Sequence, residues 1–303
     1  MKNAIRYYYN LYVENIHQAD QQYRFQIGQD HYLFVVVDLS LEEVMEVYQL
    51  STQLLQHGVL CHEIILNQQN QVVTIINQKP YVLLKMRFYK NDLVILNDCF
   101  YLTQYGIEAN KSDLLKRNDW YQLWTLKIDY LEYQVSQFGK KFPIVRESFG
   151  YFIGLSENSI TLFQQLSKKN APLCVAHRRV YKNQTLSDFY NPLNFVIDFR
   201  IRDISEYFKM RFFEGIPILE EIESYLKKAN LSEDELQLFF CRMMFPTYYF
   251  DLYEKIIAGE VPEKALLDIV DHVLEYEEFL RALYLVILKR TLLPEIEWIK
   301  KKM

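Results

Sequence analysis

The chain has 303 residues, of which 50% are hydrophobic and 24% charged, and its formal net charge is −5 at pH 7. This is the composition of a folded protein of about two domains, and it excludes collagen-like, low-complexity and disordered classes. The longest apolar run, Ala282–Leu288, is far shorter than the roughly 20 residues of a membrane helix. Without a signal-like N-terminus or a Lys/Arg cluster, the sequence predicts cytoplasmic synthesis and neither a membrane nor a nucleic-acid partner.

The glycine and cysteine content of the sequence bears on phosphate-binding loops, zinc sites and disulfides. The chain has only 8 glycines and contains neither GxGxxG nor a P-loop, the motifs whose backbone amides cradle phosphates. The cysteines form no CxxC pair, so neither a zinc site nor a disulfide framework is indicated. We expect four reduced, buried thiols: Cys61, Cys99, Cys174 and Cys241.

Residues 1–88 predict an antiparallel sheet that carries one helix. A hairpin signal at Gly28–His31 joins two aromatic and β-branched runs. Ser40 and Glu43 then form a capping box, and Gly58 ends the helix. Its apolar face is predicted to be Leu41, Val44, Met45, Tyr48 and Leu55, with Glu42, Glu43 and Glu46 in solvent. The predicted strands are Tyr23–Ile27, Tyr32–Val37, Cys61–Leu66, Val72–Asn77 and Tyr81–Met86.

Residues 89–117 show no regular pattern, and the chain from 118 onward predicts mainly helices. Gly150 and Gly154 share one helix face, which favours close helix packing. A polar loop lies between two short apolar strands, Pro172–Ala176 and Phe195–Phe199. The predicted helices are Trp120–Phe138, Pro143 to about Leu166, Asp203–Glu214, Pro217–Ala229, Ser232–Ile257 with a kink at Pro246, Pro262 to about Lys289, and a short turn after Pro294.

The fold class is therefore α+β, with a β-rich lobe at 1–88 and a helical lobe at 89–303 that contains the interrupting segment 175–205. This layout resembles the bilobal protein kinase-like fold of the aminoglycoside phosphotransferase type. The loop from Val175 to Gln184 stands where that superfamily has HGDxxxxN, and the strand 195–199 ends in Asp198-Phe199. The segment Arg202-Asp203-Ile204-Ser205 is similar to the one that opens the next helix in the superfamily.

A more specific resemblance is to the YutH-type, CotS-like branch of spore coat-associated proteins. It is carried by Gln122–Trp124, Glu147–Ile160 and Phe245–Phe250, and it extends from about residue 20 to about residue 280. The resemblance implies synthesis in the mother cell, assembly on the spore coat and other coat proteins as partners. Of the 24 tyrosines, most are expected to pack with their hydroxyls at the rim of the core; an adhesive or cross-linkable surface is the alternative.

Compared with the superfamily's motifs, the catalytic positions of this chain are degenerate. The position of the proton-accepting Asp is Arg179, and loss of a general base costs typically 10²–10⁴-fold in rate. Gln184 stands in the position of the metal-binding Asn, which Asn183 could fill only if the loop were one residue shorter. The strand expected to carry the phosphate-binding Lys, His31–Val37, contains none.

The remaining positions are expected to be structural. The resemblance implies that His177 braces the loop through backbone hydrogen bonds, and that Asp203 is a buried brace for residues 177–179. Asp198 occupies the metal position, but without catalysis we expect it to be an exposed carboxylate with no role in stability.

The sequence thus predicts a pseudokinase that binds no cofactor and serves as a structural or assembly component of the endospore coat. One alternative is a divergent small-molecule phosphotransferase that uses ATP and Mg²⁺ through Asp198 and a relocated lysine such as Lys85. The other is a nucleotide-sensing pseudokinase.

Overall fold

The computed structural model describes residues 1–19, 21–104 and 113–300. Its contacts divide the chain into two compact units. The first contains Met1–Lys116 and Val175–Ile197, and the second contains Arg117–Cys174 and Asp198–Met303. The predicted segment 175–205 is thus shared between the units, because residues 175–197 belong to the first unit and residues 198–205 to the second.

The first unit is built on a six-stranded sheet in which each pairing is antiparallel, as predicted. The strand order is β1-β2-β3-β6-β4, and β5 pairs with one end of β6. The first strand was not predicted, because only two of its four residues are apolar and three of the four are exposed. The strands are β1 (Ile16–Ala19), β2 (Gln22–Ile27), β3 (Asp30–Val36), β4 (Glu63–Ile65), β5 (Thr74–Ile76) and β6 (Lys79–Met86).

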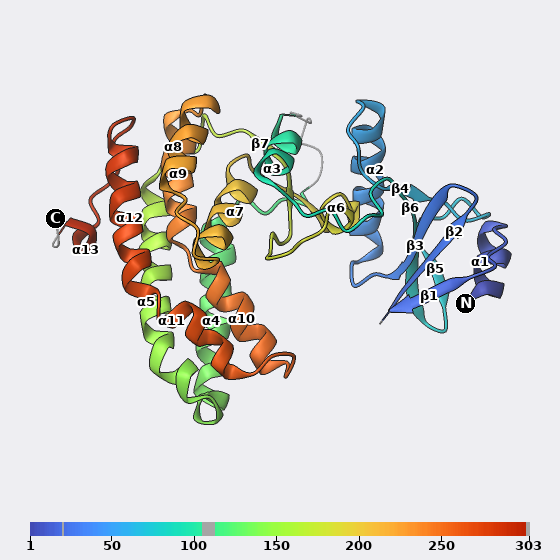
Figure 1. Cartoon of the computed structure of the whole chain (residues 1–303), viewed down its shortest axis with the longest axis horizontal. Coiled ribbons are helices and arrows are strands. Elements are labelled where there is room, and N and C mark those ends of the chain that lie inside the picture. Colours follow the sequence, from blue (N-terminus) through green and yellow to red (C-terminus); the bar gives the residue numbers. More distant parts are fainter. Residues whose placement is uncertain (20, 105–112, 301–303) are drawn as a thin grey trace. The chain divides into compact units, whose positions relative to one another are not determined.

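Helices α1 (Lys2–Tyr9) and α2 (Leu41–Gln56) lie on opposite faces of this sheet (Figure 1). Helix α1, which the sequence did not predict, packs Ile5 and Tyr9 against Phe25, Tyr32 and Phe34. Because neighbouring residues of a strand point to opposite faces, the residues next to these in β2 and β3 face the α2 side.

Helix α2 begins with the predicted capping box and is followed by Gly58 at a φ of 79°. Its predicted apolar face is partly wrong, since Leu41 and Met45 are 57% and 44% exposed. Apolar residues cover two adjoining faces of this helix, so periodicity alone does not choose between them. The buried face contains Val44, Val47, Leu50, Ser51 and Leu54.

The rest of the first unit consists of short elements. Helix α3 (Leu96–Thr103) lies within the stretch 89–117, for which no regular structure was predicted, and residues 105–112 of that stretch lie outside the described residues. Strands β7 (Leu173–His177) and β8 (Phe195–Phe199) pair in a two-stranded sheet, so the predicted interruption of the helical region is confirmed. Between them lie α6 (Leu186–Phe189) and the 3₁₀ turn η3 (Pro192–Asn194).

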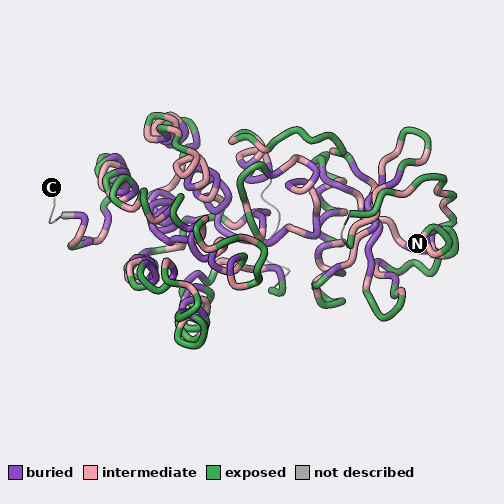
Figure 2. The backbone as a smooth tube through the Cα atoms, turned by 60° about the horizontal axis from the view of Figure 1, so that its bottom comes forward, coloured by how far each residue is buried: buried purple, intermediate pink, exposed green. Residues whose placement is uncertain are grey.

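The second unit is helical, and along most of its helices buried and exposed residues alternate as amphipathic packing requires (Figure 2). Pro246 ends a helix instead of kinking one, and the predicted helix from Pro262 is broken into three pieces. The elements are α4 (Trp120–Phe138), η2 (Gly139–Lys141), α5 (Pro143–Gln165), α7 (Arg202–Phe213), α8 (Leu219–Lys228), α9 (Glu233–Met244), α10 (Thr247–Ile257), η4 (Glu263–Leu266), α11 (Leu267–Val270), α12 (Val273–Leu288) and α13 (Glu297–Lys300).

The interpretation of Gly150 and Gly154 as close-packing positions is wrong. A Cβ built on either glycine would meet no atom within 4 Å outside its local surroundings, so no neighbouring helix approaches there. Spacing on one helix face does not show whether that face meets a partner.

Two further predictions concern the whole chain. All four cysteines are free and buried, as expected. Within the described residues, no helix combines the length and the apolar composition that crossing a membrane requires.

Candidate functional site

The loop that corresponds to the kinase catalytic loop begins at His177, the last residue of β7. The imidazole is fully buried, its Nε2 lies 2.7 Å from the carbonyl oxygen of Phe189, and its ring stacks on the Phe189 ring at 3.8 Å between centroids. These contacts tie the start of the loop to helix α6. A ring held in this way has no access to a substrate.

Two arginines follow His177. Arg179, in the position of the general base, is exposed, and its guanidinium donates to the carbonyl oxygen of Arg178 at 3.0 Å. A guanidinium accepts no proton at physiological pH. The Arg178 guanidinium lies 3.6 Å from the Glu43 carboxylate of α2. The expectation that Glu43 belongs to a purely solvated face is therefore wrong, because the loop supplies its cation.

Gln184 lies in the position of the metal-binding Asn, and only 2% of it is exposed. Its backbone carbonyl accepts a hydrogen bond from Val94 N at 3.0 Å, which fixes the loop to the segment before α3. Its side-chain Nε2 is buried and has no hydrogen-bond partner among the described residues. Asn183, which precedes it, has a φ of 58°, a left-handed conformation that asparagine tolerates.

Asp198, in the metal-ligand position, differs most from the expectation. It is fully buried instead of exposed. One carboxylate oxygen accepts from Trp120 Nε1 at 3.0 Å and from Phe199 N at 2.7 Å, while the other accepts from Trp120 Nε1 at 3.1 Å and forms an ion pair with the Arg202 guanidinium. Both oxygens are therefore engaged by donors of the same helical unit.

The electrostatics of this pair follow from its burial. Desolvation raises the pKa of Asp198, and the charges of Arg202 and Arg242 oppose that rise. Burial alone would lower the pKa of Arg202, but Asp198 raises it. Magnesium requires oxygens that can be reached together with water and substrate phosphates. With a guanidinium on one oxygen and no solvent access, Asp198 does not fit a magnesium ligand as it lies here.

A second group of buried charges lies near this ion pair. The Arg242 guanidinium lies over the rings of Trp120 and Trp124, at 4.9 and 5.5 Å from their centroids, and Arg242 Nε is 2.6 Å from a carboxylate oxygen of Glu206. Lys209 Nζ is 2.9 Å from the same oxygen. Sequence reasoning missed this cluster, because its members belong to α4, α7 and α9 and form no local motif.

Asp203, in the first turn of α7, is 2% exposed, so its predicted burial is confirmed. Its predicted hydrogen bonds with the backbone of residues 177–179 stay a prediction.

The relocated lysine of the kinase alternative, Lys85, lies on β6. Its Nζ is 2.7 Å from Asp30 Oδ2, and its partner across the β3–β6 ladder is Tyr32. Tyr32 packs on the α1 face of the sheet. Lys85 therefore lies on the face opposite α2, where it cannot pair with the glutamates of that helix.

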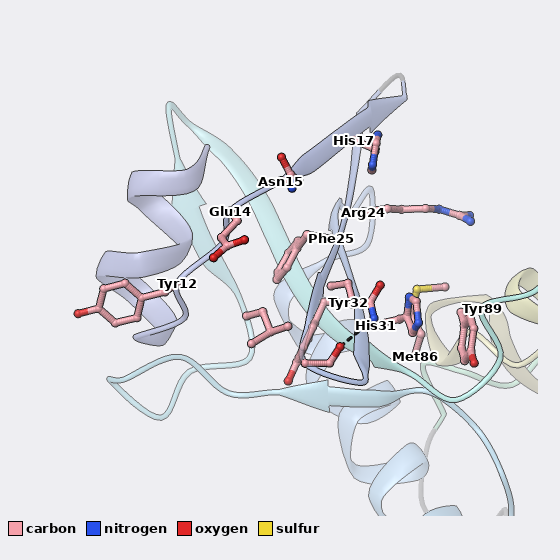
Figure 3. A pocket seen from close by; sticks show the side chains of 13 residues that line it. Tyr12, Glu14, Asn15, His17, Arg24, Phe25, His31, Tyr32, Met86 and Tyr89 are labelled. Carbon is pink, nitrogen blue, oxygen red and sulfur yellow. Dashed lines mark hydrogen bonds between the residues drawn. The ribbon is translucent and has the colours of Figure 1, made fainter.

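Arg24 on β2 is a cation that sequence reasoning missed. Its ladder partner is Leu33, which places it on the face away from α1, and it makes no hydrogen bond or ion pair with any residue that the structure describes. It lines a cavity of about 630 Å³ at the β2–β3 end of the sheet (Figure 3). On the same side as Arg24, His31 stacks on Tyr89 at 3.8 Å. The cavity is also lined by Tyr12, Glu14, Asn15, His17, Phe25, Gln26, Ile27, Gly28, Tyr32 and Met86.

An antiparallel sheet that carries one long helix, together with a larger helical unit, defines the kinase-like fold of the aminoglycoside phosphotransferase type. Solved structures of that class are similar to this chain. The aminoglycoside phosphotransferase of Alicyclobacillus acidocaldarius superposes with a TM-score of 0.69 at 11% identity, covering 95% of this chain and 97% of that one. An amicoumacin kinase gives a TM-score of 0.57 at 14% identity, covering 99% and 96%.

Within this class, the chain belongs to the family described as "Spore coat putative kinase YutH", which matches residues 2–283. The match begins earlier than the predicted resemblance from about residue 20. The chain is also 24% identical over 340 aligned positions to the endospore coat-associated protein YutH of Bacillus subtilis (strain 168), covering 99% of this chain and 98% of that protein.

Proposed function

We propose that this protein is a pseudokinase, a kinase-like protein without phosphotransfer, that acts as a structural or assembly component of the endospore coat. Membership of the YutH family and the coat association of the B. subtilis relative support the coat location and coat proteins as partners. The loss of catalysis is supported by the candidate site.

The observation that carries the proposal is that both carboxylate oxygens of Asp198 already have partners within the protein. A kinase needs this carboxylate to hold the metal ion that bridges the phosphates of ATP. Here both of its oxygens are engaged by Trp120, Arg202 and the Phe199 amide, so the guanidinium supplies the positive charge that a metal would bring. No further ion is needed to balance the carboxylate.

The other catalytic positions support the same conclusion. Arg179 accepts no proton, the amide of Gln184 brings no negative charge for a metal, and Lys85 lies on the wrong face of the sheet. Kinase-like phosphoryl transfer depends on positioning and charge stabilisation by these groups together.

A thermal-shift titration of the purified chain with ATP, with and without Mg²⁺, tests the proposal. A ligand at 100 times its Kd would stabilise the fold by about 2.7 kcal/mol, which is a shift of roughly 5–10 °C for units of this size. We expect no saturable shift that requires Mg²⁺. Such a shift in the natural chain that is lost in Asp198→Asn would show that Asp198 holds a metal and would overturn the proposal.

The coat location is tested separately with a fluorescent fusion followed through sporulation. We expect fluorescence to appear only in sporulating cells and to surround the forming spore. Diffuse fluorescence in growing cells would instead favour a metabolic kinase.

The cavity beside Arg24 favours a second candidate, a pseudokinase that senses a nucleotide without turning it over. Arg24 is a cation without a hydrogen-bonded partner among the described residues, and the stacked His31–Tyr89 pair offers a planar surface. In this case ATP without Mg²⁺ would stabilise the natural chain, and Arg24→Ala would abolish the shift while Arg6→Ala, on helix α1, would not. The absence of any shift with metal-free ATP rules this candidate out.

A further inference from the structure

The two faces of the six-stranded sheet differ in charge. Strands β1 to β6 contain two acidic residues, Asp30 and Glu63, and both lie on the face that packs against α1. The ladder partner of Asp30 is Ile27, which packs on that face, and Glu63 pairs with Lys85. Each carboxylate has a cation: Lys85 Nζ is 2.7 Å from Asp30, and an Arg87 guanidinium nitrogen is 3.9 Å from Glu63. The strands therefore contribute no acidic side chain to the opposite face.

The opposite face carries three nitrogen-bearing side chains, one from each of β1, β2 and β3, which we call the basic row: His17, Arg24 and His31. His17 is a direct ladder partner of Arg24, and His31 is diagonal to Arg24 because it lies two residues before Leu33, the other partner. Directly opposed residues have Cβ atoms about 4.5–5.5 Å apart, and diagonal ones about 7–8 Å. The three side chains lie on one side of β2 (Figure 3), so one small ligand can reach all of them.

The basic row faces open space without an acidic partner. None of its members makes a hydrogen bond or ion pair with a residue that the structure describes, although the His31 ring is held by stacking on Tyr89. The row lines the cavity of about 630 Å³, a volume in the range of small-molecule sites. One carboxylate, that of Glu14, is among the lining residues, and it lies on the other side of β2, next to Phe25 (Figure 3). The side of the cavity that holds the row therefore favours an anion.

We propose that the basic row binds the phosphate group of a small molecule. A guanidinium donates two parallel hydrogen bonds to a phosphate, and an imidazole offers an N–H donor in either protonation state. Three donor groups match the three terminal oxygens of a phosphate, whereas a carboxylate has two. The site shares its cavity with the nucleotide-sensing alternative but requires no nucleoside. It also does not depend on whether the chain has lost phosphotransfer.

Calorimetric titration with inorganic pyrophosphate, in metal-free buffer of constant ionic strength, tests the site. We expect saturable binding that Arg24→Gln weakens by at least about tenfold, because a charged donor is lost. Arg24→Lys keeps the charge but loses the fork, so it should retain part of the affinity. Lys79→Gln is the matched control, because Lys79 is an exposed cation of the same sheet whose ladder partner, Ile76, packs on the α1 face. No binding, or equal effects of Arg24→Gln and Lys79→Gln, would overturn the proposal.

Further ligands identify the group that the cavity recognises. Metal-free ATP should compete with pyrophosphate for one site, while adenosine should not bind. Malonate, a dianion with two carboxylates, should bind more weakly than pyrophosphate. Binding of ATP without binding of pyrophosphate would show that the nucleoside is recognised, and this result would replace the phosphate site with the nucleotide-sensing alternative. Malonate binding as tight as that of pyrophosphate would also contradict the proposal.

The imidazole signals in NMR spectra locate the bound ligand. Pyrophosphate should shift the signals of His17 and His31, which His17→Gln and His31→Gln assign. The signal of His272, which is exposed in the helical unit, should stay unchanged. Shifts confined to other histidines would place the binding outside the basic row and refute the assignment.

Discussion

The sharpest prediction concerns Asp198→Asn, which removes the charge from the buried ion pair and keeps the shape of the side chain. The carboxylate is fully buried, and only 9% of the Arg202 side chain is exposed. Removing one partner of a buried pair costs about 3–5 kcal/mol, because the remaining charge keeps its desolvation penalty without this counter-charge. A loss of that size is a large share of the 5–15 kcal/mol that stabilises a typical domain.

Urea unfolding followed by tryptophan fluorescence measures this loss. The chain has three tryptophans, and all of them belong to the helical unit: Trp120, Trp124 and Trp298. With a urea m-value of about 1–3 kcal/mol/M, the midpoint of Asp198→Asn should fall by roughly 1 M or more. Glu254→Gln, which breaks a partly exposed pair with Lys127 in the same unit, is the control and should cost less than about 1 kcal/mol.

A second variant separates the charge from the packing. Replacing both partners, with Asp198→Leu and Arg202→Met together, should restore most of the stability, because apolar substitutes for a buried pair are often neutral or stabilising. If Asp198→Asn unfolds at the same urea concentration as Glu254→Gln, the ion pair does not exist in solution and the physical basis of the proposed pseudokinase fails.

Three further predictions concern residues of the helical unit. Burial alone would raise the pKa of Glu206, but Lys209 and Arg242 lower it from 4.5 to about 2. Between these pH values the unfolded chain therefore binds more protons than the folded chain. About 3 kcal/mol of stability that is present above pH 4.5 should be lost as the pH falls towards 2. Acid unfolding curves should show this loss in the natural chain and a smaller one in Glu206→Gln. Gly154→Ala should raise the thermal midpoint, with a gain of about 0.5–1 kcal/mol, since the helical site has room for a methyl group; a lower midpoint would restore the close-packing interpretation. Asp203→Ala should lose about 1–3 kcal/mol in urea melts if its carboxylate accepts buried backbone donors, and a loss below about 0.5 kcal/mol would show that Asp203 is not a brace.

Local sequence patterns were sufficient for most elements of the fold. Some features depend on a few adjacent residues and could therefore be predicted from the sequence alone. They are the helix caps at Ser40 and Ser232, the hairpin at Gly28 and the N-terminal proline of α5. Helix α1 was missed because its tyrosine-rich sequence resembles a strand. Pro246 was correctly identified as a breaker, although the sequence did not show that it separates two helices.

Some properties of the candidate site could likewise be predicted from the sequence, and others depend on the tertiary structure. The sequence by itself determined which catalytic side chains are absent, because the identities at positions 179 and 184 and the lack of lysine between His31 and Val37 do not depend on folding. Only the tertiary structure decided that Asp198 is buried and held by Trp120, 78 positions away, and that Lys85 and Arg24 lie on opposite faces of the sheet. Burial and pairing depend on contacts between segments far apart in the chain, and no local pattern records which distant donor will meet a given carboxylate.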